Sequence, residues 1–238
     1  METWRRLLAG TLGLCLGSVA LACGDRGDEA DAIRTALADP APRWKGAMEA
    51  LHVPSMVVVI VGPDGPLFVE ELGQQNLEAG LPVTSETRFY IASATKPFVA
   101  LATTLLAHRD SLTLNRPVRT YLPRFELADP TETITITVRD LLAHRRGLQD
   151  YAITFGEAVS GQMNDERFYR LLERVEAVGE LDYQNLHYTL LGRVIEAVTG
   201  MSWKRYLERA VLRPAGLDRT TTRVAPLTAD ADAAVPYE

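Results

Sequence analysis

Cysteine, lysine and histidine are scarce in this sequence of 238 residues, and their scarcity narrows the chemistry open to it. The two cysteines, Cys15 and Cys23, both lie near the amino terminus, which excludes a framework of disulfide bonds. No C-x-x-C, H-E-x-x-H or G-x-x-x-x-G-K motif occurs, so neither metal nor nucleotide chemistry has the support of a motif. We therefore expect no metal site and no cofactor.

Two further absences concern positive charge and one class of nucleophile. The formal net charge is −6 and no basic patch stands out, which argues against nucleic acid as a partner. None of the seven serines lies in a G-x-S-x-G motif, which counts against the catalytic triad of the α/β-hydrolases. Hydrophobic residues make up 47% of the chain, as in an ordinary domain that buries a core.

The amino terminus has the pattern of a bacterial export signal. Two arginines precede an apolar run over residues 7–22, which is too short for a typical membrane-spanning helix. The end of this run, Ala20-Leu-Ala22, fits the A-x-A cleavage rule, and Cys23 follows it directly. The segment also resembles a lipoprotein signal, in which Cys23 is lipidated and becomes the mature amino terminus.

This pattern divides the chain into three predicted segments. They are a signal peptide over residues 1–22, a polar tether with the start of the first helix over 23–40, and a partial folded domain over 41–238. We expect an exported protein, either periplasmic or anchored to the membrane through a lipid on Cys23. The alternative is plain secretion, in which Cys23 is an incidental residue of the signal peptide.

The most informative motif is a serine followed three residues later by a lysine, Ser93 and Lys96. Residues i and i+3 share one face of a helix, so the hydroxyl and the amine can meet there. A serine hydroxyl is a weak nucleophile until a nearby group takes its proton, and lysine can be tuned for that task whereas arginine cannot. Only three lysines occur in the chain, so a chance pairing is uncommon. The structural alternative is that Ser93 caps a helix and Lys96 is solvated.

A second polar pair, Tyr183 and Asn185, precedes an apolar helix. In an extended segment, residues two apart point the same way, so both side chains would face one cleft. A tyrosine there acts as a general base if a nearby lysine lowers its pKa from about 10. The carboxamide of Asn185 can hold a substrate amide. The structural alternative packs Tyr183 on the core and makes Asn185 a helix cap.

Turn residues and hydrophobic periodicity outline an α+β fold. Strands are predicted over 56–61 and 67–71, on either side of the turn signal Pro63-Asp64-Gly65. The predicted long helices cover residues 94–108, 167–178, 186–199 (ended by Gly200) and 203–212. Two early strands followed mainly by helices predict an antiparallel sheet with a helical subdomain beside it.

A short helix is predicted between these longer ones. Thr137 and Asp140 fit a capping box that opens a helix ending at His144. We place Gly147 near the end of this helix, at a position that needs a positive φ angle. His144 is interpreted as a structural histidine rather than a catalytic base, because Ser93 already has two candidate partners.

Together, the motifs resemble those of a known family. Ser93-Ala-Thr-Lys96 followed by Tyr183-Gln-Asn185 resembles the serine β-lactamase-like hydrolases, and in style the class C β-lactamases most closely. The resemblance runs from about His52 to Glu238 and includes the blocks 80–89, 112–123, 136–148 and 190–200. The same group contains D-alanyl-D-alanine carboxypeptidases, D-amino-acid peptidases and certain esterases.

The resemblance implies a β-lactamase/transpeptidase-like fold and a serine hydrolase that forms an acyl-enzyme. Ser93 is then the nucleophile, while Lys96 and Tyr183 pass the proton. Asn185 is then the residue that orients the substrate. The implied partner is a small-molecule or peptide substrate: an amide, a β-lactam, a D-amino-acid peptide or an ester.

One motif of the family is missing from the chain. The family carries a Lys-Thr-Gly or a His-x-Gly on a strand beyond the tyrosine, and neither follows Tyr183 here. We therefore expect a C-terminally truncated member whose sheet is incomplete. The alternative function is that of a non-catalytic or inactive member, which binds a peptidoglycan-like or β-lactam ligand.

Overall fold

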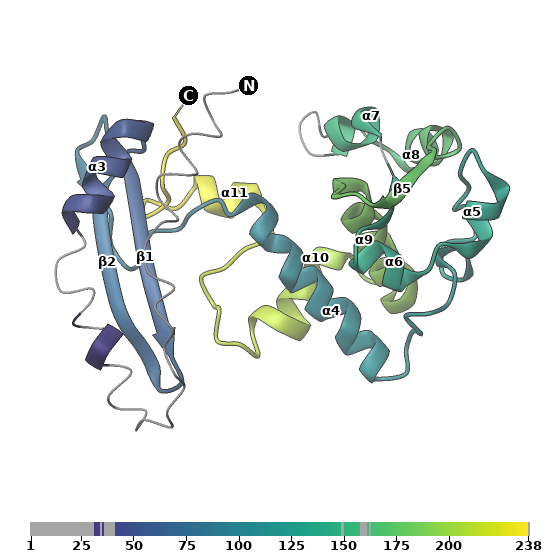
Figure 1. The fold of residues 1–238 in the computed structure, drawn as a ribbon, viewed down its shortest axis with the longest axis horizontal. Helices are drawn as coiled ribbons and strands as arrows, with labels where there is room; N and C mark the ends of the chain where they lie inside the picture. Colours follow the sequence, from purple (N-terminus) through teal and green to yellow (C-terminus); the bar gives the residue numbers. More distant parts are fainter. Residues whose placement is uncertain are drawn as a thin grey trace, which may run out of the picture. The chain divides into compact units, whose positions relative to one another are not determined.

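The computed structural model describes residues 31–33, 35, 41–148, 150–157, 161 and 163–237, and these form two compact units (Figure 1). The first unit runs up to Thr87 and includes a return segment that starts at Ala234. The second unit comprises Arg88–Ala233. The signal peptide predicted over residues 1–22 and the predicted lipidation site Cys23 lie outside the described residues, so both stay predictions.

The first unit is built on a hairpin of two strands. β1 (Ser55–Gly62) and β2 (Gly65–Asn76) pair antiparallel, which confirms the predicted hairpin, although both strands extend beyond the predicted bounds. α3 (Ala41–Leu51) contacts this hairpin, where the ring of Trp44 meets the ring of Phe68 edge-on at 5.5 Å (Figure 1). Burial of these two aromatic rings holds the helix against the strands.

The last described residues of the chain return to the first unit. Val235 donates its N–H to the carbonyl oxygen of Gln75 at 2.8 Å. The hydroxyl of Tyr237 accepts from the N–H of Leu77 at 2.7 Å and donates to the carboxylate of Glu78 at 2.6 Å. These hydrogen bonds pair segments that no local sequence pattern connects.

The second unit is mainly helical (Figure 1). In the described residues, no helix combines the length and the apolar character that crossing a bilayer requires. The elements of the second unit follow in the order η1 (Ala92–Thr95), α4 (Lys96–His108), η2 (Val118–Thr120), α5 (Pro130–Thr135), α6 (Val138–Leu142), β4 (Arg145–Leu148), α7 (Tyr151–Phe155), α8 (Asp165–Leu172), β5 (Ala177–Leu181), α9 (Asn185–Thr199), α10 (Trp203–Leu207), the π-helical turn η4 (Glu208–Leu212) and α11 (Val224–Thr228).

α9 lies at the centre of the core of the second unit, and α4, α6, α7 and α10 contact it. Its inward face recurs every three to four residues and is fully buried at Leu190, Leu191, Val194 and Ile195. Each such side chain contributes roughly 1.5–3 kcal/mol when it leaves water. Gly200 ends the helix with a φ angle of +68°, as predicted.

The other predicted helices are confirmed with one exception. The helix predicted over residues 167–178 ends at Leu172 as α8, and the chain then forms β5, which pairs antiparallel with β4. The prediction was wrong because ladder hydrogen bonds from β4 stabilise residues 177–181 in the extended form, and such pairing leaves no helical or strand signal in the local sequence. α6 begins with the predicted capping box, in which Thr137 and Asp140 each accept the other's backbone N–H, but ends at Leu142.

Gly147 also departs from its predicted role. It lies within β4, and the positive φ angles in this stretch belong to His144 (+53°) and Arg146 (+58°). Gly147 is needed for space instead, because a Cβ atom there would lie 2.6 Å from the Cβ of Asp182 and 2.7 Å from the carbonyl oxygen of Val178. This close approach brings the end of β5 against β4.

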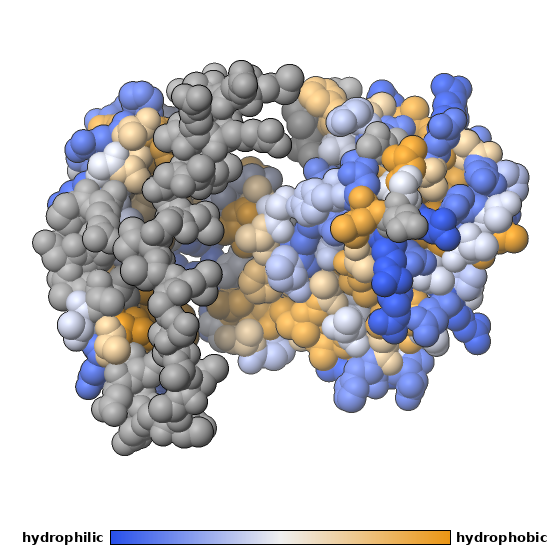
Figure 2. Space-filling model, in the orientation of Figure 1, coloured by the Kyte–Doolittle hydropathy of each residue, from blue (hydrophilic) through white to orange (hydrophobic). Residues whose placement is uncertain are grey.

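Small antiparallel sheets and many helices confirm the α+β class. Among the described residues, the larger sheet has the order β1-β2-β3, where β3 is Leu81–Pro82, so β1 is an edge strand. Val59 and Val61 on β1 keep 49% and 68% of their surface exposed. Figure 2 shows hydrophobic surface, in orange, among hydrophilic surface. An edge strand with exposed apolar side chains is a template for pairing with a further strand.

We expect Gly147→Ala to lower the free energy of unfolding more than the control Gly200→Ala does. No atom lies within 4 Å of a Cβ at Gly200, so only its left-handed backbone is strained there, at a cost of about 1–2 kcal/mol. At Gly147 the new Cβ collides with the Asp182 segment. Urea unfolding followed by circular dichroism measures both losses, and an equal or smaller loss for Gly147→Ala would contradict the close approach.

Candidate active site

Ser93 lies in the 3₁₀ turn η1, directly before α4, and its side chain is exposed. The preceding residue, Ala92, has a φ angle of +45°, which residues other than glycine rarely adopt. Strain of this kind persists only where the surrounding structure enforces it, and it clusters at functional sites. The turn therefore presents the hydroxyl group to solvent, where a substrate can reach it.

Lys96 is the first residue of α4 and connects two helix starts. Its Nζ donates to the Oγ of Ser93 at 3.1 Å and to the Oδ1 of Asn185 at 2.7 Å. The short 3₁₀ turn before α4 keeps the i, i+3 relation between serine and lysine, so both heads point to one side. The predicted serine–lysine contact is present.

Tyr183 stands beside the same ammonium group. The Nζ of Lys96 lies 4.6 Å from the centroid of the Tyr183 ring. Hydrogen bonding by Lys96, and secondly by Ser93, lowers the pKa of the Tyr183 hydroxyl below its ordinary value of 10.0. The side chain is 57% exposed, so the lowered pKa belongs to a group that a substrate can approach.

Asn185 reaches the site from the start of α9. The chain is extended at Gln184 (φ −131°, ψ 140°) and turns helical at Asn185. The N-cap position of α9 is Gln184, and no side-chain cap hydrogen bond forms there. The carboxamide oxygen of Asn185 thus accepts from Lys96 instead of capping its own helix.

The structure brings all four predicted site residues together in the second unit, and it does not support the structural alternatives. The N-cap of α4 is Thr95, so Ser93 does not cap it, and Lys96 binds two side chains rather than water alone. Tyr183 is exposed and not part of the core. The roles of these residues in catalysis stay predictions.

Two histidines adjoin the site: His144, which the sequence predicts to be structural, and His187, which no sequence motif marks. The Nδ1 atoms of His144 and His187 lie 3.0 Å apart, and the His144 ring lies 4.6 Å from the Tyr183 ring. His187 is fully buried in α9. The sequence does carry a signal for this residue. His187 precedes Leu190 and Leu191 by three and four residues, so it lies on the buried face of α9, where a polar group needs a hydrogen-bond partner.

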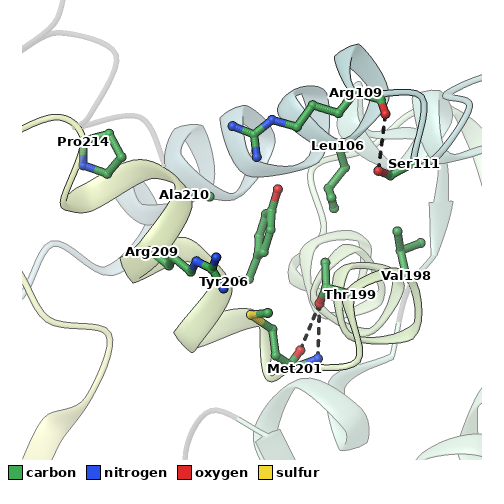
Figure 3. A pocket seen from close by; sticks show the side chains of 10 residues that line it. All are labelled: Leu106, Arg109, Ser111, Val198, Thr199, Met201, Tyr206, Arg209, Ala210 and Pro214. Carbon is green, nitrogen blue, oxygen red and sulfur yellow. Dashed lines mark hydrogen bonds between the residues drawn. The ribbon is translucent and has the colours of Figure 1, made fainter.

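A cavity of about 510 Å³ in the second unit is separate from these residues (Figure 3). Side chains of α4, α9 and α10 line it, with Arg109 and Arg209 at its edge and Tyr206 between them. None of the four site residues contributes to its lining. In the part of the chain that the structure describes, no group of three or more His, Cys, Asp or Glu side chains is arranged to hold a metal ion.

Comparison with known families shows to which family the chain belongs. Residues 37–238 match the family model described as Beta-lactamase, which is most of the chain. The chain belongs to the β-lactamase family. The family membership agrees with the resemblance carried by the serine–lysine and tyrosine–asparagine motifs.

Several proteins that resemble the chain are considerably longer. Protein flp of Staphylococcus aureus (strain N315) is 30% identical over 181 residues, which cover 71% of this chain and 35% of that protein. A penicillin-binding protein homologue from Pyrococcus abyssi aligns with a TM-score of 0.69 at 26% identity, over 83% of this chain and 47% of that chain. A class C β-lactamase in complex with cefoxitin aligns with a TM-score of 0.70 at 19% identity, over 87% of this chain and 55% of that chain.

The chain therefore spans between about a third and about a half of the length of these proteins. The fold matches the β-lactamase/transpeptidase-like architecture, as predicted, and its sheet is incomplete relative to these neighbours.

Lys96→Met should raise the pKa of Tyr183 toward its ordinary value, because the lysine is the largest cause of the lowering. The tyrosinate absorbance of Tyr183 is isolated by subtracting the titration of the Tyr183→Phe variant. Lys204→Met is the matched control, since that ammonium group faces the Trp203 ring at 5.7 Å and does not contact the site. An unchanged Tyr183 titration in Lys96→Met would show that the lysine does not set this pKa.

Proposed function

We propose that the chain provides the nucleophile and base of a serine hydrolase that works through an acyl-enzyme. The observation that carries this proposal is the 3.1 Å contact between Ser93 Oγ and Lys96 Nζ, with Tyr183 beside the same ammonium group. Membership in the β-lactamase family supports the reaction class. The exposed hydroxyl and phenol leave room for a substrate.

In the acylation step, Tyr183 accepts the proton of Ser93. The hydrogen bond from Lys96, together with its positive charge, stabilises the phenolate form of Tyr183, so a larger fraction of this residue is deprotonated near neutral pH and able to accept that proton. The Oγ of Ser93 attacks the substrate carbonyl carbon, and a tetrahedral oxyanion forms. Tyr183 then gives the proton to the leaving nitrogen or oxygen as the scissile bond breaks, which leaves an ester on Ser93.

In the deacylation step, the same phenolate takes a proton from water. The resulting hydroxide attacks the ester carbonyl, and Ser93 recovers its proton as the acid product leaves. The backbone N–H of Ser93 serves as one oxyanion donor, because it lies at the start of the helical segment η1–α4. Asn185, held by Lys96 through its oxygen, presents its amide N–H groups to the substrate.

The proposed substrates are an amide, a β-lactam, a D-amino-acid peptide or an ester. All four present a carbonyl carbon that the Ser93 hydroxyl can attack, and the similar proteins include a penicillin-binding protein homologue and a class C β-lactamase in complex with cefoxitin. One fold supports many such reactions, so the substrate has to be measured.

A second candidate function is a ligand-binding module of the same fold, which acylates slowly or not at all. Among the residues of this sequence no Lys-Thr-Gly or His-x-Gly motif follows Tyr183, and this alternative describes a chain that works without one. Loss of a single oxyanion donor lowers the rate by roughly 10²–10³. A chain with one such donor would therefore bind a peptidoglycan-like or β-lactam ligand and turn it over very slowly.

Incubation with a fluorescent penicillin and with an activated ester tests the hydrolase proposal. We expect a covalent adduct by mass spectrometry that is lost in Ser93→Ala and kept in the control Ser85→Ala, which removes another exposed serine. Tyr183→Phe should slow adduct formation by about 10²–10⁴. A stable adduct without turnover identifies the binding module. No adduct from either probe in a folded sample would contradict the proposal that the chain is a serine hydrolase.

We also propose that the chain is exported and that a lipid on Cys23 anchors it to the membrane. In cell fractionation, we expect the unchanged chain in the membrane fraction and Cys23→Ser in the soluble exported fraction. Cys15→Ser is the matched control, because it changes a cysteine inside the segment that is removed. Equal distribution of the two variants would contradict anchoring through Cys23.

A further inference from the structure

The two histidines beside the site form a directly hydrogen-bonded pair. The Nδ1 of His144 lies 3.0 Å from the Nδ1 of His187. On its other side, the Nε2 of His187 lies 2.9 Å from the carbonyl oxygen of Arg146. His187 is fully buried, and this carbonyl belongs to the β4 strand, so the second ring is anchored at both nitrogens.

The contacts of the two rings constrain which nitrogens carry hydrogen. A carbonyl oxygen only accepts, so the Nε2 of His187 is the donor to Arg146. In neutral His187 the Nδ1 is then an acceptor. The Nδ1 of His144 lies 3.0 Å from this acceptor and 3.3 Å from the backbone nitrogen of Gln184, whose N–H also points to it. We infer that the Nδ1 of His144 carries the hydrogen, because the contact with the buried ring of His187 is the shorter of the two. The neutral pair thus shares one hydrogen in a defined direction, from His144 to His187.

His144 in turn contacts the residue that we propose as the base. Its ring lies 4.6 Å from the Tyr183 ring at an interplanar angle of 33°, and its carbonyl oxygen accepts from the N–H of Asp182 at 3.0 Å. With 57% of its surface exposed, Tyr183 has few neighbours that can fix its ring. The His144 imidazole, the Lys96 ammonium and the hydroxyl of Ser93 contact this ring and its phenol group.

We propose that His144 is a positioning residue for Tyr183, and that His187 holds His144 in place through the bond between the two Nδ1 atoms. The catalytic consequence rests on the proposed function, in which Tyr183 carries the proton. The structural consequence does not rest on it: without the His187 acceptor, the His144 ring turns, and the Tyr183 phenol moves away from Lys96. The pKa of the Tyr183 phenol then rises.

Charged groups from several elements face the pair. Lys96 approaches from α4, Asp140 from α6 and Asp182 from the end of β5, and the rings of Tyr183 and Tyr188 adjoin His144. Burial, and next the positive charge of Lys96, lowers the pKa of His144 below 6.5. Burial lowers the pKa of His187 to about 4. Both rings are therefore neutral at neutral pH.

The sign of the pH dependence follows from these shifts. The unfolded chain binds protons on these histidines at a higher pH than the folded chain does, so the stability that they confer is present above pH 6.5 and is lost as the pH falls toward about 4. Protonation of His187 reverses the shared bond, because its Nδ1 then donates to His144. The new positive charge also lies in the neighbourhood of Lys96, so acid should disturb the placement of Tyr183.

Two variants of the full chain separate a positioning role from a packing role. His187→Leu fills the space but removes the acceptor, whereas His187→Asn keeps an acceptor oxygen where Nδ1 stands. We expect His187→Leu to lower the maximal rate of acylation by an activated ester by about 10–100-fold, since small misplacements of reacting groups have effects of this size, with little change in the half-saturating concentration. His187→Asn should stay within about threefold of the unchanged chain.

The titration of Tyr183 gives a readout that does not require activity. It should move to higher pH in His187→Leu and stay in place in His187→Asn, each measured against the same variant with Tyr183→Phe. An unmoved titration in His187→Leu, or an equal shift in both variants, overturns the proposal. If the unchanged chain forms no adduct, the proposed hydrolase function fails while this titration still decides the positioning role.

Nitrogen-15 spectra of the histidine side chains in the unchanged chain provide a check that needs no variant to fold. At neutral pH we expect the hydrogen of His187 on Nε2 and the hydrogen of His144 on Nδ1. Hydrogens on Nε2 of both rings would leave two lone pairs facing each other across 3.0 Å, and that result would overturn the proposed bond.

Discussion

A single ammonium group connects the parts of the candidate site. The Nζ of Lys96 donates to Ser93 in the turn before α4 and to Asn185 at the start of α9, 89 residues further along the chain, and it lies against the Tyr183 ring. Its hydrogen bond is also the largest cause of the lowered pKa of Tyr183. An arginine at this position would keep the charge but lose the compact head that meets all three groups, because a guanidinium is a planar fork. The chemistry that we propose depends on this one contact network.

The scaffold supplies the rest by placing three chain segments around Lys96. The buried face of α9 fixes the helix that begins at Asn185. The tight approach at Gly147 brings the end of β5 against β4, and the short connection from there to α9 carries Tyr183. The histidine pair then bridges β4 and α9 at the same place. The hydrophobic core and the β4–β5 pair hold these backbone segments in place, and the polar side chains of the site therefore contact one another.

Residues with a local signal were predictable and those that depend on remote pairing were not. The serine–lysine spacing, the capping box at Thr137 and the glycine that ends α9 could each be read within a few residues of sequence. The helix over 167–178 was predicted too long because the ladder between β4 and β5 joins segments about 30 residues apart, which local periodicity does not register. Gly147 was assigned a turn conformation, whereas its real constraint is the Asp182 side chain opposite. His187 belongs to no local motif, and its role follows only from the buried face of α9 that it shares with Leu190 and Leu191.

The central claim is that Ser93 is an activated nucleophile, and an active-site-directed fluorophosphonate tests it most directly. This reagent phosphonylates an activated serine whatever its natural substrate is, and peptide mapping by mass spectrometry locates the label. The account predicts labelling at Ser93 alone among the seven serines of the chain, with loss of the label in Lys96→Met. Labelling spread over other exposed serines, or full labelling of Ser93 when Lys96 is replaced, would contradict it.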